Sequence, residues 1–179
     1  MNSDSTIHSI AIGTFDGVHL AHQRLISLCE GVVVIERGLA TLTRGYRRSF
    51  YIDKPLFVYH FDRLSLQTPQ EFIAMLKEDF PKLKRIVVGY DFAFGHNKSG
   101  NAQTLKKIFE GEVVLIKEMK CEGVSIHSSA IKSFICEGQI DRANKLLGRP
   151  YEMMGCAIKG QGIGTKAGGG VDQGHQDQR

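Results

Sequence analysis

Short runs of β-branched and aromatic residues recur along the chain, and polar or helix-like stretches separate them. The strand candidates are residues 7–12, 32–36, 56–61, 85–89 and 112–119. Apolar runs of this length, bounded by polar and turn-forming residues, indicate buried strands. Because helical stretches alternate with the strands, the order predicts an α/β fold in which crossover helices join parallel strands.

Helices are expected between these strands, over residues 19–30, 69–80 and 102–109. Thr68 and Glu71 have the spacing of a capping box, with Pro69 at the first helical position. Residues 128–148 predict two short helices broken at Gly138. The fold class that follows is a Rossmann-like doubly wound parallel sheet, which binds ligands beyond the carboxyl ends of its strands.

Composition excludes several classes of protein. The net charge of +4, from 23 Lys+Arg against 19 Asp+Glu, is too small to imply nucleic-acid binding but suits an anionic small substrate. Arg44, Arg47 and Arg48 form either a solvated loop or part of a site for such an anion.

No apolar run approaches the ~20 residues of a membrane span. The first residues lack an export signal, so we expect no membrane partner and a cytoplasmic location.

The segment GTFDGVHLAHQ, residues 13–23, lies where the first strand ends and the first helix begins. Its glycines permit a tight turn, and a helix N-terminus offers free N–H groups to a phosphate. His19 and His22 share one helix face and could donate hydrogen bonds to phosphoryl oxygens. Two packed or surface histidines are one alternative; a zinc site is another, although zinc commonly takes about three or four protein ligands. Together with Asp16, the turn favours phosphate contact.

A second segment, GYDFAFGHNKSGN at residues 89–101, combines aromatic residues with glycines that permit a ligand-wrapping loop. Phe92 and Phe94 could stack on a flat ring, while Asp91 and Asn101 could hydrogen-bond its polar edges. The alternative interpretation places both phenylalanines in the core.

A third segment, VSIHSSAIK at residues 124–132, predicts a helix that begins near two serines. Ser128 and Ser129 could hold phosphate through their hydroxyls and the backbone N–H groups, with Lys132 nearby. Helix capping alone would also explain the serines.

These segments resemble the HxGH nucleotidylyltransferase superfamily, in the FDGxHxGH form typical of bacterial bifunctional riboflavin kinase/FAD synthetases. The second and third segments are similar to that family's GxDFxFGxxxxGN and ISSTxIR motifs. The resemblance implies an FMN adenylyltransferase (FAD synthetase), which makes FAD and pyrophosphate from the small-molecule substrates FMN and ATP with Mg²⁺. Catalytic roles would fall on His19, His22 and Lys132. ATP binding would fall on Gly13, Phe15, Asp16, Gly17, His19, His22, Ser128, Ser129 and Lys132, and flavin binding on Asp91, Phe94, Gly95 and Asn101.

Four positions depart from the family motifs. Ala21 replaces a Gly, His127 a Ser, Ser129 a Thr and Lys132 an Arg. Lysine keeps the charge of arginine but lacks its bidentate fork. Two alternatives stay open: a catalytically attenuated flavin- or nucleotide-binding protein, and an adenylyltransferase for another phosphorylated acceptor. The segment at 89–101 favours the flavin branch. Metal ligands and oligomeric state are not predicted.

The resemblance also suggests how the chain is divided. Residues 1–150 have the size of one adenylyltransferase domain. Residues 144–164 resemble the junction with a riboflavin kinase module, so residues 151–165 would be a truncated start of that module. Residues 166–179 are rich in Gly and Gln and are expected to be disordered.

Overall fold

A computed structural model of the chain describes residues 6–38 and 40–153. Its centre is a five-stranded parallel sheet in the order β3-β2-β1-β4-β7. The strands are β1 (Ser9–Gly13), β2 (Gly31–Glu36), β3 (Leu56–His60), β4 (Arg85–Gly89) and β7 (Glu112–Ile116). This arrangement confirms the predicted doubly wound α/β fold. The order reverses direction at β1, which pairs with β2 on one side and with β4 on the other.

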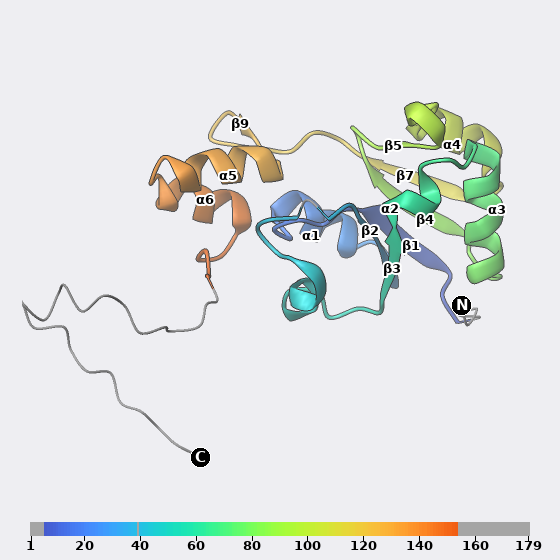
Figure 1. The fold of residues 1–179 in the computed structure, drawn as a ribbon, viewed down its shortest axis with the longest axis horizontal. Coiled ribbons are helices and arrows are strands. Elements are labelled where there is room, and N and C mark those ends of the chain that lie inside the picture. Colours follow the sequence, from blue (N-terminus) through green and yellow to red (C-terminus); the bar gives the residue numbers. More distant parts are fainter. Residues whose placement is uncertain (1–5, 39, 154–179) are drawn as a thin grey trace, which may run out of the picture.

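Side chains of the central strands alternate between two cores, as the two-residue period of a strand requires. Ile10 and Ile12 point into one core, while Ala11 belongs to the other. Helices on both sides of the sheet cover these cores (Figure 1). Helix α1 (Leu20–Ile26) covers one face; α3 (Pro69–Asp79) and α4 (Ala102–Ile108) cover the opposite face.

Helix α3 begins where the sequence predicts. The Thr68 side chain accepts a hydrogen bond from the Glu71 N–H, and the Glu71 carboxylate accepts one from the Thr68 N–H. Together these bonds satisfy two donors that a helix start would otherwise leave unpaired. The helix then buries Phe72, Ile73 and Leu76 against the sheet.

Two predicted elements are at least three residues shorter in the structure. The helix expected over residues 19–30 ends at Ile26, because the chain must turn before Glu30, the residue that precedes β2. There the Glu30 N–H donates to the carbonyl of Ser9, the first residue of β1. The strand expected over 112–119 ends at Ile116, which pairs with the last residue of β4. A small hairpin follows, formed by β8 (Lys120–Cys121) and β9 (Val124–Ser125).

Several short elements lie between the main strands and helices along the chain. They are the 3₁₀ helices η1 (Gly45–Phe50) and η2 (His96–Lys98), the helix α2 (Phe61–Leu64) and the paired strands β5 (Ala93–Phe94) and β6 (Gly100–Asn101). The pair β5 and β6 encloses η2, so the glycine-bearing second segment forms a compact hairpin.

The last described helices, α5 (Ser128–Cys136) and α6 (Ile140–Leu147), are separated at Gly138 as predicted. They pack together around Ile131, Phe134 and Leu147, beside α1 (Figure 1). The expectations for residues 154–179, including the disordered tail and most of the truncated kinase start, lie outside the described residues.

Candidate active site

A cleft of about 850 Å³ opens beyond the carboxyl ends of β1, β2, β4 and β7. Its position at the reversal of strand order is where doubly wound sheets bind ligands, and its volume is typical of a small-molecule site, roughly 300–1,000 Å³. The sequence-predicted residues that line it are Gly13, Phe15, His19, His22, Asp91, Phe94, Gly95, Ser128 and Ser129. Ala21 and His127, two of the departures from the family motifs, also line it.

The turn between β1 and α1 forms the floor of the cleft. Phe15 is fully buried with a φ of 49°, and its ring lies against Gly13. Gly17 has a φ of 88°, and a Cβ at this position would lie 2.7 Å from Leu42 Cδ1. The turn therefore needs a glycine at position 17 for both conformation and space.

His19 and His22 form a stacked pair at the start of α1, with ring centroids 3.6 Å apart. His19 caps the helix: its Nδ1 accepts a hydrogen bond from the His22 N–H at 3.3 Å. A neutral His19 ring must then carry its proton on Nε2, which leaves a donor for a ligand. Burial and the nearby His127 lower the pKa of His19 to about 4. Burial and His19 lower the pKa of His22 well below its usual value.

Asp16, Gly17 and Lys132 do not line the cleft, although the resemblance implies ATP contacts for all three. Asp16 is 5% exposed, and its carboxylate accepts bonds from the backbone N–H groups of residues 41–43. Lys132 Nζ lies 2.8 Å from Asp16 Oδ2. Burial alone would raise the pKa of Asp16, but Lys132 and the backbone N–H groups outweigh it and lower that pKa.

The N-terminus of α5 also faces the cleft. His127, Ser128 and Ser129 line it, and the His127 side chain makes no capping bond to the helix. Ser128 Oγ donates to the Asp16 carbonyl at 2.6 Å. Tyr90 Oη lies 3.5 Å from His127 Nδ1. The amides of this helix start are thus placed where an anion could accept from them.

The residues predicted to contact flavin, in the 89–101 segment, lie partly in the cleft and partly in the core. Phe94 is 6% exposed and packs on Phe72, with ring centroids 5.3 Å apart, so it belongs to the core while also reaching the cleft. Phe92 is the less buried of the two phenylalanines and also lines the cleft. Asn101 does not line the cleft: its Oδ1 caps α4 by accepting from the Gln103 and Thr104 N–H groups.

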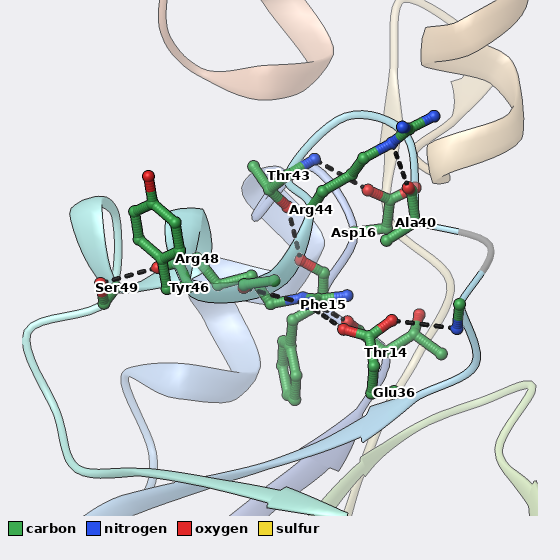
Figure 2. Close-up of polar contacts among 12 residues, drawn as sticks. Thr14, Phe15, Asp16, Glu36, Ala40, Thr43, Arg44, Tyr46, Arg48 and Ser49 are labelled. Atoms are coloured by element: carbon green, nitrogen blue, oxygen red, sulfur yellow. Dashed lines mark hydrogen bonds and ion pairs between the residues drawn. The ribbon is translucent and has the colours of Figure 1, made fainter. Parts of the chain in front are cut away.

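Arg48 is neither in a solvated loop nor free for an anion. Its side chain is 3% exposed; Nη1 pairs with Glu36 at 2.7 Å and Nε donates to the Thr14 carbonyl at 2.9 Å (Figure 2). Thr43 Oγ1 bonds the neighbouring Phe15 carbonyl (Figure 2). Arg48 therefore fastens η1 to the floor of the cleft, a role that requires long-range contacts and has no signal in the local sequence.

Arg149 is a second residue that sequence reasoning missed. It donates to the Gly17 carbonyl at 2.7 Å and to the Val18 carbonyl at 3.1 Å. Its guanidinium lies 3.7 Å from the centre of the Tyr51 ring. The glycine turn is thus held from the end of α6 as well as from η1.

The charged residues that line the cleft are mainly basic. Arg37, Lys98 and Lys117 contribute cationic side chains, against the single carboxylate of Asp91. This balance suits a ligand with several negative charges. Among the described residues, no three His, Cys, Asp or Glu side chains converge to hold a metal ion. No helix in the same part of the chain is long and apolar enough to cross a membrane.

The fold and the cleft define the class: a doubly wound α/β protein with a ligand site at its topological switch point. Residues 46–130 match the FAD synthetase family. A bifunctional riboflavin kinase/FMN adenylyltransferase of Buchnera aphidicola subsp. Schizaphis graminum is 30% identical over 197 residues, which cover 94% of this chain and 62% of that protein. These similarities support the resemblance to the FAD synthetase family that the motifs predict.

Other relatives have the same description. The Escherichia coli K12 protein is 28% identical over 187 residues, covering 89% of this chain and 60% of its own length. The chain thus spans about 60% of the curated relatives it matches. A solved structure described as a macrolide-efflux protein from Streptococcus pneumoniae has a TM-score of 0.70 and 27% identity, over 83% of this chain and 58% of that one.

Proposed function

We propose that the chain is an FMN adenylyltransferase that transfers AMP from ATP to FMN. A phosphate oxygen of FMN attacks the α-phosphorus of ATP, the bond from that phosphorus to the bridging oxygen of pyrophosphate breaks, and FAD and pyrophosphate result. The supporting observation is that the stacked His19–His22 pair and the N-terminus of α5 line one cleft, in a chain whose residues 46–130 match the FAD synthetase family.

Charge stabilisation and alignment are what this reaction needs from the protein, because no covalent intermediate is involved. We assign phosphate contacts to His19, His22 and the α5 amides near Ser128 and Ser129. A neutral His19 with its proton on Nε2 would donate to a phosphoryl oxygen without itself losing a proton. Gly13, at the end of β1, has no side chain and therefore does not crowd the ring of Phe15.

The flavin ring would lie along the 89–101 segment. Phe92 and Phe94 line the cleft there, and an aromatic ring can stack on a flat ligand. Asp91 would accept from polar ring edges, and Gly95 keeps the loop close to Pro69. Asn101 contributes by capping α4, which fixes the end of the same hairpin.

Mg²⁺ would reach the cleft on the ATP phosphates. Asp91 is the single carboxylate that lines the cleft and is assigned to the flavin edge, so the substrate phosphates and waters would supply most of the Mg²⁺ ligands, as is usual for this ion. The ion would neutralise phosphate charge. We place this activity in the cytoplasm, with ATP and FMN as small-molecule substrates.

The direct test supplies FMN, ATP and Mg²⁺ and follows FAD and pyrophosphate by chromatography, with His22→Ala as the comparison. The proposal expects FAD from the wild-type chain and much less from the variant. Folded wild-type protein that binds FMN or ATP without forming FAD would instead identify an attenuated binding protein. Turnover of a different phosphorylated acceptor would identify a related adenylyltransferase.

A further inference from the structure

We infer that Asp16 is a positioning residue, which works with Lys132 to set the placement of the two helix N-termini at the cleft. The inference rests on the proposed function, because it assigns a purpose to a buried carboxylate beside the proposed phosphate site. It also gives Lys132 a role different from the phosphate contact that the family resemblance implies.

The Asp16 carboxylate joins three separate parts of the chain. Oδ1 accepts from the N–H groups of Leu42 at 2.9 Å and Thr43 at 3.0 Å. Oδ2 accepts from the Thr41 N–H at 3.2 Å and lies 2.8 Å from Lys132 Nζ. The β1–α1 turn is therefore bonded both to the loop before η1 and to α5.

Two residues of α5, one helical turn apart, hold Asp16. Ser128 Oγ donates to its carbonyl at 2.6 Å, and Lys132 pairs with its carboxylate. Positions four apart lie on the same helix face. The start of α5 is thus fixed against the turn that leads directly into His19 at the start of α1.

Lys132 has its charge engaged in this contact. It does not line the cleft, whereas Ser128 and Ser129 on the same helix do. Its partner carboxylate is 7% exposed, so the ion pair is shielded on one side from water. Removing Lys132 would leave a buried carboxylate with backbone donors alone.

A double-mutant cycle separates a positioning role from an independent phosphate contact. Asp16→Asn keeps an oxygen that can accept from the Leu42 and Thr43 N–H groups and removes the charge, and Lys132→Met removes the partner. We expect each single variant to weaken binding of Mg²⁺ and α,β-methylene ATP about tenfold, and the double variant to bind as weakly as either, because coupled residues are non-additive. Calorimetric titration measures the affinities. An additive, roughly hundredfold loss in the double variant would overturn the inference.

Two further variants make the cycle specific. Lys132→Arg keeps a cation for Asp16 and is expected to restore wild-type affinity. Lys145→Met removes an exposed pair with Glu122, 2.6 Å long, on the neighbouring helix and serves as the matched control. A failure of Lys132→Arg to restore binding, or an equal loss in Lys145→Met, would contradict a specific positioning role.

Amide hydrogen exchange without ligand covers the case in which Asp16→Asn does not fold. Lys132→Met is expected to speed exchange at residues 41–43, while Lys145→Met leaves it unchanged. Unchanged exchange together with lost nucleotide binding would make Lys132 a direct phosphate ligand and refute the inference. A wild-type chain that does not bind the ATP analogue also refutes it. A chain that binds the analogue but makes no FAD counts against the proposed function alone.

Discussion

His22 donates its backbone N–H to Nδ1 of His19, and the two rings stack with 15° between their planes. His19 therefore both caps the helix and packs on the ring of His22. Both rings are neutral at neutral pH, because burial lowers their pKa values, with a further contribution from His127 at His19 and from His19 at His22. The pair can therefore donate to phosphate only as neutral imidazoles.

Stability is expected to fall on mild acidification. The folded pKa of His19, about 4, lies below the unfolded value of 6.5, so the unfolded chain binds more protons between these values. His19 stabilises the fold fully above pH 6.5, and lowering the pH to 5 removes roughly 1–2 kcal/mol of the free energy of unfolding. Urea denaturation at several pH values measures this slope. His19→Asn keeps a good helix cap and should flatten it; an unchanged slope would mean that His19 is not responsible.

Loss of the second imidazole is expected to affect the reaction rate more than the fold. His22→Ala should lower kcat by about 10²–10³, the usual effect of deleting one donor to a developing charge. Steady-state FAD formation gives the number, with circular dichroism as the check on folding. A folded variant with wild-type kcat would remove His22 from the proposed phosphate contacts.

Arg48 is expected to be important for stability. Arg48→Met leaves Glu36 and the Thr14 carbonyl without their buried partner, at a cost of about 3–5 kcal/mol in the free energy of unfolding. Adding Glu36→Gln should recover part of the loss, because the uncompensated charge is gone. Urea denaturation of both variants tests this, and a double variant less stable than Arg48→Met would contradict it.

The cap of α3 offers a prediction remote from the cleft. Thr68→Ala removes one half of the capping box and should cost about 1 kcal/mol in the free energy of unfolding. Glu71→Gln should cost less, because glutamine can still accept from the Thr68 N–H. Equal losses from the two substitutions, measured by urea denaturation, would argue against this account.

A side chain at position 17 is expected to destabilise the fold for two reasons. Gly17→Ala forces a positive φ on alanine and places Cβ against Leu42. Gly123 has a similar φ of 79° with open space around it, so Gly123→Ala carries only the conformational cost, about 1–2 kcal/mol. Gly17→Ala should be the more destabilising in thermal unfolding. Equal melting temperatures for the two variants would show that Leu42 moves aside without cost.

Local patterns were sufficient for most of the fold. The apolar runs around Ile10, Val33 and Val87 predict strands because a parallel sheet buries both of its faces. The capping box at Thr68 predicts the start of α3 because its bonds are made within one turn of the chain. Element ends were less predictable: β7 stops at Ile116 because its partner strand stops there, which is a property of the pairing.

The three motif segments meet at one cleft, and the sequence alone determined that much, because carboxyl ends of parallel strands share one edge of the sheet. Only the tertiary structure decided which residues within the segments reach the cleft. Asp16 and Lys132 turn toward each other, since a buried carboxylate must find charge and donors. Arg48 and Arg149 bond to carbonyls of the turn from positions far along the chain. Such partners are fixed by packing in three dimensions, and no spacing along the chain encodes them.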